Sequence, residues 1–365
     1  MTQTNSLKEA ARQALAPIAE DMAAVERIIA QEMQSGVGRV EEIARYITSA
    51  GGKRMRPALL ILMARAMGAD REKAAYLGAV IEILHTATLM HDDVVDEGMM
   101  RRGRPTANAR WDNPHAVLVG DFLYTRSFQM MVRAGNLKVM QALADAANRL
   151  SEGEVLQMNN AHNPDTDEAQ YFAVIERKTA CLFEAAAHMA AAIAEATPEM
   201  EDACTRYCLH LGNAFQIADD ILDYAGEAAA IGKNLGADLR EGKVTLPLLY
   251  AMQLASAEDR ECIREAVRKG EGDFEHISRI VIASGALEKC VPHALRKIVV
   301  GGEALQARYV NMWKRAIPEA ELYNMYGPTE TTVDCAALHL TPANRDDEPI
   351  PIGRACRNMQ LLLLK

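Results

Sequence analysis

The first 288 residues carry apolar side chains at helical spacing almost without interruption. Stretches such as LKEAARQALAPIAEDMAAVERIIAQEM and YFAVIERKTACLFEAAAHMAAAIAEA repeat them every three or four positions, which is the period of one helix face. Alternating β-branched runs, which would predict strands, are almost absent there. We therefore expect an all-α fold over residues 1–288, in a region long enough to enclose a large core.

The remaining residues, 289–365, have a different composition. Prolines become frequent, and short apolar runs such as LRKIVVGG and MQLLLLK indicate strands. We place a boundary near Ala286 to Lys289. The sequence thus predicts two domains, a helical one over 1–288 and a smaller α/β segment over 289–365.

Charge and composition exclude several classes of function. The net charge of −10 argues against a general nucleic-acid binder. No stretch approaches the roughly 20 apolar residues that a membrane span needs, so we expect no transmembrane segment. The N-terminus has no signal-peptide pattern. The seven cysteines form no CxxC pair and have no histidine at zinc spacing, so we interpret them as reduced thiols of a cytoplasmic protein.

Two acidic motifs, HDDVVDE and QIADDILDY, share the pattern Asp-Asp-x-x-Asp within apolar helical surroundings. The first and last aspartates of each motif lie about 40° apart on a helix, where like charges repel. One such motif alone is best interpreted as a solvated helix end, but two copies favour a bound cation. Oxygen ligands without histidine or cysteine favour Mg²⁺, or Mn²⁺, which completes its shell with water and phosphates. The candidate metal ligands are Asp92, Asp93, Asp96, Asp219, Asp220 and Asp223.

Basic residues accompany the acidic motifs. GGKRMRP precedes a helix start, where backbone N–H groups favour an anion, and MMRRGRPT supplies guanidinium groups that bind phosphate in bidentate fashion. We interpret Arg54 and Arg104 as ordinary surface cations. The others suit two phosphorylated substrates, one of them bridged to the aspartates by metal. These other cations are Lys53, Arg56, Arg101, Arg102, Lys178, Lys233 and Lys243.

Together these stretches resemble the signature regions of trans-polyprenyl diphosphate synthases. The motifs are GGKRMRP, HTATLMHDDVVDEGMMRRGRPT, GDFLYTRSFQ, ERKTA and FQIADDILDY…GKNLGADLREGKVTLPLL, in family order over roughly residues 1–288. The chain is most similar to the bacterial members that form octaprenyl chains. The resemblance implies a homodimer with an isoprenoid-synthase-type helical bundle, in which two aspartate-rich helices face each other across a central cavity. It also implies several Mg²⁺ ions and head-to-tail transfer of an allylic group, such as that of farnesyl diphosphate, to isopentenyl diphosphate, giving a product of about C40.

The resemblance implies a role for each candidate residue. Asp92, Asp96 and Asp219 would act in catalysis together with Lys178. Small side chains at Ala87 and Thr88 imply a long product, with the stop set deeper, at Leu84 or in FLYTRSFQMM. Taken alone, His85 is as well explained as an ordinary core histidine. The allylic diphosphate would contact Arg101, Lys178, Thr179, Gln216, Lys233 and Lys243, and isopentenyl diphosphate would contact Lys53, Arg56, His85 and Arg102.

Residues 289–365 resemble part of an adenylation domain of peptide synthetases. GGEAL, NMYGPTETT and PIGR carry the likeness, which implies that Tyr326, Gly327, Thr329 and Glu330 correspond to residues near the nucleotide. The phosphate loop, the ribose-binding aspartate and the C-terminal lysine of that family are missing, so we expect no adenylation. The synthase region would lack its usual last helices. Two alternatives to an active prenyltransferase stay open, a non-catalytic partner subunit of such an enzyme and an adenylate-forming ligase fragment.

Overall fold

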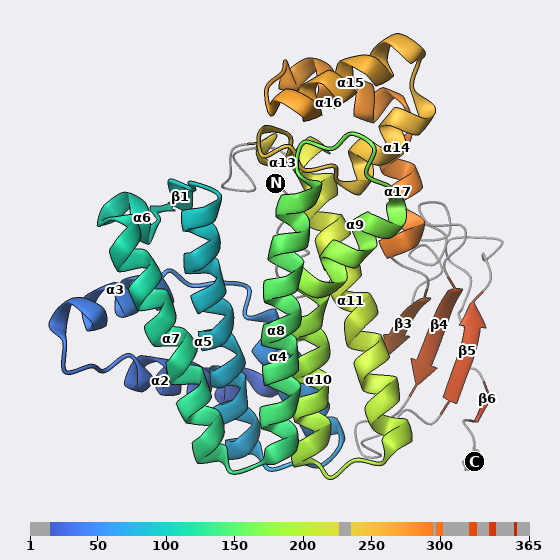
Figure 1. Cartoon of the computed structure of the whole chain (residues 1–365). Coiled ribbons are helices and arrows are strands. Elements are labelled where there is room, and N and C mark those ends of the chain that lie inside the picture. Colours follow the sequence, from blue (N-terminus) through green and yellow to red (C-terminus); the bar gives the residue numbers. More distant parts are fainter. Residues whose placement is uncertain are drawn as a thin grey trace.

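Long helices dominate the computed structural model, which describes residues 15–225 and 235–294 and the short stretches 297–301, 321–326, 336–340 and 354–355. In Figure 1, α5, α7, α8, α10 and α11 lie side by side as the body of a bundle. The predicted all-α fold of the first domain is confirmed for the described residues, in which the two-residue strands β1 and β2 are the exceptions.

The helices, together with the two-residue strands β1 and β2, follow one another along the chain. Up to the second acidic motif they are η1 (Ala16–Ile18), α2 (Ala19–Glu32), α3 (Gly38–Thr48), α4 (Met55–Ala66), α5 (Arg71–Val95), β1 (Met100–Arg101), β2 (Arg104–Pro105), α6 (Ala107–Arg110), α7 (Asn113–Ala134), α8 (Leu137–Asn160), α9 (Glu168–Ile175), η2 (Glu176–Ala180), α10 (Cys181–Ile193) and α11 (Pro198–Ala225). After it come α13 (Ala237–Arg240), α14 (Leu246–Leu254), α15 (Ala257–Lys269), α16 (Phe274–Ala283) and α17 (Ala286–Ala294).

Polar side chains fix the starts of the long helices. Asp70 accepts a hydrogen bond from the Lys73 N–H at the start of α5, and Asp112 accepts one from the His115 N–H at the start of α7. Each cap satisfies a backbone donor that has no partner within the helix. Gly135 ends α7 with a φ of 67°, a left-handed conformation in which glycine carries no Cβ penalty.

Two large hydrophobic cores hold the bundle together, and a small third cluster of Phe183, Ala187 and Cys208 lies between α10 and α11. The first lies chiefly between α2, α4, α5, α7, α8 and α10, and the second joins α9 and α11 to α14, α15, α16 and α17. Alanines such as Ala87 and Ala186 are fully buried in the first core, which allows close helix packing. None of the helices among the described residues combines the length and apolarity required to cross a bilayer. The described cysteines are all free thiols.

The segment after the second core forms a small sheet. Its strands are β3 (Lys297–Gly301), β4 (Glu321–Tyr326), β5 (Ala336–Leu340) and β6 (Arg354–Ala355), hydrogen-bonded in that order. β3 pairs with β4 in parallel, and the other two pairs are antiparallel. The predicted strand in LRKIVVGG corresponds to β3, whereas MQLLLLK lies outside the described residues.

The predicted domain boundary near Ala286 to Lys289 falls inside a helix. α17 (Ala286–Ala294) runs across it and contacts both α11 and α14. Tyr326 is the last residue of β4, while Gly327, Thr329 and Glu330 lie outside the described residues. The division into a synthase domain and a partial adenylation-like segment remains a prediction.

Candidate active site

The two acidic motifs occupy the C-terminal ends of α5 and α11. Asp92 and Asp93 lie in the last turn of α5, and Asp96 is its C-cap, with its N–H donating to the Asp92 carbonyl at 2.8 Å. Asp219 and Asp223 lie in the last two turns of α11. A helix C-terminus carries partial negative charge, so these carboxylates are unfavourable there. Both positions therefore suit a bound cation.

A π-helical turn, η2 (Glu176–Ala180), stands between α9 and α10, and the charge of its Lys178 acts on Asp92 of the first motif. The Lys178 ammonium donates to Glu154 Oε2 at 2.7 Å. Burial raises the pKa of Asp92, and the charge of Lys178 is the largest influence opposing that rise. Such π-turns occur frequently at functional sites. Glu154, on α8, was not predicted, since no sequence motif marks it.

The next residue of the same turn interacts with the second motif. Thr179 donates to Gln216 Oε1 at 2.7 Å, and Gln216 Nε2 donates to Asp220 Oδ1 at 2.8 Å. The Tyr171 hydroxyl donates to the other Asp220 oxygen at 2.6 Å. Burial raises the pKa of Asp220 to about 6, although these two hydrogen bonds oppose the shift. Asp220 is thus fixed by protein donors, and Tyr171 is a second site residue that the sequence did not reveal.

A lysine after α13 lies near the first motif and is linked to the second through the backbone of Asp238. The Lys243 Nζ atom lies 3.7 Å from Asp96 Oδ2 and is also paired with Glu241. The backbone of Lys243 donates to the Asp238 carbonyl at 2.8 Å, and the Asp238 N–H donates to Asp223 Oδ2 at 3.4 Å. Burial acts to lower the pKa of Lys243, but the surrounding carboxylates raise it above its usual value. The structure therefore brings the two acidic motifs to one region.

A tight turn holds Arg102. β1 and β2 pair antiparallel with Arg102 and Gly103 between them, at φ values of 53° and 74°. Two positive φ values in a two-residue loop match the type I′ turn that suits strand twist. Arg102 donates to the Gly51 carbonyl. A Cβ at Gly52 would lie 2.8 Å from this guanidinium, so a larger residue there would displace the flexible Arg102 side chain.

Two further cations of this region stack on aromatic rings. Arg56 Cζ lies 4.7 Å from the Phe183 ring centroid, and Lys53 Nζ lies 5.0 Å from that of Phe215. The Phe183 and Phe215 centroids are 5.6 Å apart. Arg56 Nε is buried and has no hydrogen-bond partner. A half-buried guanidinium whose buried Nε is unsatisfied suits an anionic ligand.

His85 lies within the same basic group. Burial, followed by the charges of Arg56, Arg102 and Arg101, holds the pKa of His85 well below its ordinary value. Its ring therefore stays neutral at neutral pH. Arg101 differs from Arg56 and Arg102, because its Nε donates to Asp93 Oδ1 at 2.7 Å. Within the described part of the chain, neither Arg56 nor Arg102 has a carboxylate within ion-pair distance.

The interpretation of Arg54 as a surface cation is wrong. Its side chain is only 9 % exposed and forms 2.7 Å ion pairs with Glu26 and the buried Glu82. Arg54 therefore fixes α2 and α5 against the start of α4. Arg104 is exposed, as predicted. Lys233 lies outside the described residues.

The donor set fits a hard divalent ion that takes few protein ligands. Among residues 15–225 and 235–294, no three histidine, cysteine, aspartate or glutamate side chains converge on one point. An ion held by one or two carboxylates, with water and phosphate oxygens completing its shell, needs no such cluster.

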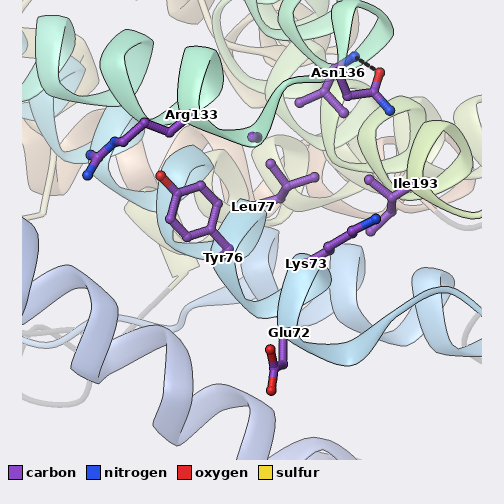
Figure 2. Close-up of a pocket in the computed structure, with 9 residues that line it drawn as sticks. Glu72, Lys73, Tyr76, Leu77, Arg133, Asn136 and Ile193 are labelled. Carbon is purple, nitrogen blue, oxygen red and sulfur yellow. Dashed lines mark hydrogen bonds between the residues drawn. The ribbon is translucent and has the colours of Figure 1, made fainter.

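A defined cavity lies at the opposite end of α5 (Figure 2). Its volume is about 510 Å³. Leu77 lies among Tyr76, Lys73 and Ile193, with Arg133 at one edge. Leu77 precedes Asp92 by about four helical turns, which is about 22 Å along the helix axis. The full lining is Glu72, Lys73, Tyr76, Leu77, Arg133, Ala134, Asn136, Val139 and Ile193.

Comparison with known proteins matches this architecture. The family model described as polyprenyl synthetase matches residues 37–283. Octaprenyl diphosphate synthase of Escherichia coli K12 is 45% identical over 301 residues, covering 82% of this chain and 93% of that protein. The all-trans-nonaprenyl-diphosphate synthase (geranyl-diphosphate specific) of Rhodobacter capsulatus is 45% identical over 305 residues, covering 83% and 94% of the two chains.

Solved structures share the fold. A polyprenyl synthase from Caulobacter crescentus CB15, complexed with calcium and isoprenyl diphosphate, superimposes with a TM-score of 0.75 at 40% identity, covering 78% of this chain and 88% of that chain. A decaprenyl diphosphate synthase from Rhodobacter capsulatus gives a TM-score of 0.72 at 45% identity, with the same coverage of both chains. The chain belongs to the polyprenyl synthetase family, whose enzymes use a divalent metal. Within it, the chain is a long-chain trans-polyprenyl diphosphate synthase.

Proposed function

We propose that this synthase adds isopentenyl diphosphate repeatedly to an allylic diphosphate, such as farnesyl diphosphate, with Mg²⁺, and releases a product of about C40. The names of the octaprenyl and nonaprenyl diphosphate synthases among its relatives support this product length. The observation that carries the proposal is that two adjacent residues of one π-turn serve different acidic motifs: the charge of Lys178 acts on Asp92 of the first, and Thr179 hydrogen-bonds to Gln216 of the second. A single diphosphate bound at that turn would lie within reach of both motifs.

The allylic diphosphate and its metal ions belong between α5 and α11 in this proposal. Asp92, Asp96 and Asp219 would hold Mg²⁺, with Asp93, Asp220 and Asp223 completing the acidic surroundings. Asp93 and Asp220 would mainly hold neighbouring side chains in place, because one oxygen of each already accepts a hydrogen bond, from Arg101 and from Tyr171. The phosphate oxygens would contact Arg101, Lys178, Thr179, Gln216, Lys233 and Lys243.

Isopentenyl diphosphate belongs beside the glycine-rich start of α4. Its phosphates would contact Arg56, Arg102, Lys53 and the neutral ring of His85. The absence of carboxylate partners for Arg56 and Arg102 within the described residues supports this assignment, since an anion would supply the missing charge. Two separate anion sites then bring an electrophile and a nucleophile together.

The reaction begins with cleavage of the bond between the first allylic carbon and the diphosphate oxygen. A bound divalent metal supplies charge neutralisation of the leaving diphosphate. Lys178 and Lys243 donate hydrogen bonds to its oxygens as negative charge develops. The double bond of isopentenyl diphosphate then forms the new carbon–carbon bond, and the departing diphosphate accepts the proton that is lost. The apolar surface around Leu84 excludes water, which would otherwise capture the carbocation.

The product chain would extend along one face of α5. Asp92, Thr88, Leu84 and Leu77 follow one another at intervals of four, four and seven residues, so they share a face. Ala87 adjoins this face with a small, fully buried side chain. This face ends at the cavity lined by Leu77. We therefore place the far end of a long product in that cavity. Leu84 and Leu77 would then decide when elongation stops.

A homodimer is the proposed assembly. α7 and α8 expose large apolar side chains, which a second copy of the chain could cover. Leu118 and Leu137 are 66% and 81% exposed. The other members of this surface are Val132, Val155 and Met158.

Residues 289–365 contribute no activity in this proposal. The adenylation-like segment lacks the phosphate loop of that family. Every catalytic and binding residue named above precedes residue 244. The proposed location is the cytoplasm, in keeping with the free thiols of the described cysteines.

Incubation with labelled isopentenyl diphosphate, farnesyl diphosphate and Mg²⁺ tests the function. We expect chain elongation that Asp92→Ala abolishes and that Asp145→Ala, a change of an exposed carboxylate on α8, leaves intact. Binding without turnover by the unaltered protein would instead indicate a partner subunit. Amino-acid-dependent pyrophosphate exchange would indicate an adenylate-forming ligase.

A further inference from the structure

Helix α8 approaches the π-turn very closely at Gly153. A Cβ at this position would lie 2.8 Å from the Lys178 backbone nitrogen and 2.8 Å from the Arg177 Cβ atom. Real Cβ atoms do not come so near to a backbone atom, so only glycine allows the helix and the turn to make this contact. The next residue of α8, Glu154, is thereby brought beside the Lys178 side chain.

Glu154 engages Lys178 with one oxygen only. Oε2 accepts the ammonium hydrogen bond at 2.7 Å, while Oε1 is buried and has no hydrogen-bond partner. The two side chains are 23% and 20% exposed, so solvent screens the pair only partly. A hydrogen bond between two charged groups under these conditions fixes the flexible lysine side chain.

The Lys178 ammonium lies among several charged groups. The largest charge acting on Asp92 is that of Lys178, and the largest acting on Glu154 is that of Asp92. Asp96 adds a further negative charge to both, while Arg101 and Lys243 add positive charge at Asp92. Lys178 therefore hydrogen-bonds to a carboxylate of α8, while its charge also acts on Asp92 of α5.

We propose that Glu154 is a positioning residue for Lys178. It holds the lysine ammonium beside Asp92 before substrate arrives, so that the allylic diphosphate meets a cation already in place. This inference rests on the proposed function, because it assumes that Lys178 contacts that diphosphate. A lysine has considerable side-chain entropy to lose on binding, and ordering it in advance increases the affinity for the anion.

A double-mutant cycle with Glu154→Ala, Lys178→Ala and the double variant tests the inference. The measurement is calorimetric binding of inorganic pyrophosphate in Mg²⁺. We expect Glu154→Ala to weaken binding about tenfold, the effect of one charge-assisted hydrogen bond. The double variant should bind within about twofold of Lys178→Ala, because without the lysine there is nothing to position. Additive losses, or no loss in Glu154→Ala, would overturn the inference.

Two further variants separate positioning from folding and from charge. Glu154→Gln keeps an oxygen that accepts from Lys178, so its binding should stay close to that of the unaltered protein. Loss equal to that of Glu154→Ala would overturn the positioning role. Glu152→Ala, at an exposed residue two positions earlier on α8, is the matched control and should bind normally.

Steady-state kinetics supply a second readout. Glu154→Ala should raise KM for the allylic diphosphate and leave KM for isopentenyl diphosphate unchanged. If the unaltered protein does not bind pyrophosphate with Mg²⁺ at all, the proposed function fails. If it binds and Glu154→Ala binds equally well, only the positioning role fails.

Discussion

Lys243 Nζ lies 3.7 Å from Asp96 Oδ2, so a cation that follows the second acidic motif reaches a carboxylate of the first. Replacing it with methionine keeps most of the side-chain volume and removes the charge. We expect Lys243→Met to lower kcat/KM for the allylic diphosphate by about one to two orders of magnitude, because the charge-assisted hydrogen bond from Lys243 to that diphosphate is lost.

The same variant should leave KM for isopentenyl diphosphate unchanged, because that substrate is assigned to a different group of cations. Steady-state kinetics with each substrate varied in turn make the measurement. Lys269→Met, at an exposed lysine on α15, is the control. A change confined to KM for isopentenyl diphosphate would contradict the assignment of Lys243.

Arg54 and Arg56 are two residues apart and should respond oppositely to methionine substitution. Arg54 is paired with the buried Glu82, so Arg54→Met leaves an unpaired buried carboxylate and should cost about 3–5 kcal/mol of stability. Arg56 has a buried, unsatisfied Nε, so Arg56→Met should leave the stability unchanged or raise it.

The effect on substrate binding should be larger for Arg56→Met than for Arg54→Met, the reverse of the effect on stability. Arg56→Met should raise KM for isopentenyl diphosphate at least about tenfold, since a bidentate phosphate contact is lost. Thermal unfolding and kinetics on both variants make the test. Equal destabilisation by both substitutions would show that Arg56 is a structural cation instead.

The pH dependence of stability should reveal Asp220. Its pKa is raised by burial from 3.8 to about 6, so between these values the folded protein holds a proton that the unfolded chain has released. The contribution of Asp220 to stability therefore falls as pH rises through this window, and the destabilisation is complete above about pH 6. Asp220→Asn removes this dependence and should stabilise the protein at pH 7 by roughly 3 kcal/mol.

The amide that replaces the Asp220 carboxylate can be accommodated if Gln216 reverses its own amide group. The Gln216 oxygen then accepts from the introduced amide and the Gln216 nitrogen donates to the Thr179 hydroxyl oxygen, so both amides keep partners and the Thr179 hydroxyl changes from donor to acceptor in this pair. Denaturant unfolding from pH 4 to pH 8 gives the comparison, with the exposed substitution Asp145→Asn as control. A stability difference independent of pH would contradict the raised pKa.

Ala87→Phe should shorten the products. The introduced phenyl ring would occupy space beside the face of α5 along which the prenyl chain is proposed to run. The overpacking should cost about 1–3 kcal/mol. Ala75→Phe is a matched control, because Ala75 is also buried and lies about 120° around the helix from Ala87. Ala75→Phe should destabilise the protein to a similar extent without shortening the prenyl products. Chromatography of the dephosphorylated products makes the comparison, and an unchanged product ladder from Ala87→Phe would reject this course for the chain.

Local patterns in the sequence predicted much of the fold. Helical periodicity identified the bundle, because burial of one helix face leaves a regular mark in the sequence. The Asp-Asp-x-x-Asp spacing likewise indicated the two helices, α5 and α11, whose C-terminal ends carry the acidic motifs. The sequence could not reveal the role of Arg54, since its partners Glu26 and Glu82 each lie 28 positions away.

Packing rather than pattern determines the remaining site residues. Glu154 reaches Lys178 only because Gly153 lets two backbones approach, and Tyr171 reaches Asp220 across 49 positions of sequence. Neither contact follows from spacing along one element. The helical character of Ala286–Ala294 was similarly hidden, because the composition changes within α17 while its packing against α11 continues.

The crowded carboxylates at the end of α11 have a consequence for the lifetime of the protein. Burial raises the pKa values of Asp220 and Asp223, so the empty enzyme keeps these charges at the expense of its own stability. Ligand present at a hundredfold excess over its Kd would add about 2.7 kcal/mol of stability. Proteases act on transiently opened molecules, so degradation in the cell would be fastest when isoprenoid precursors are scarce. The abundance of the synthase would then follow the supply of what it consumes, without a separate regulator.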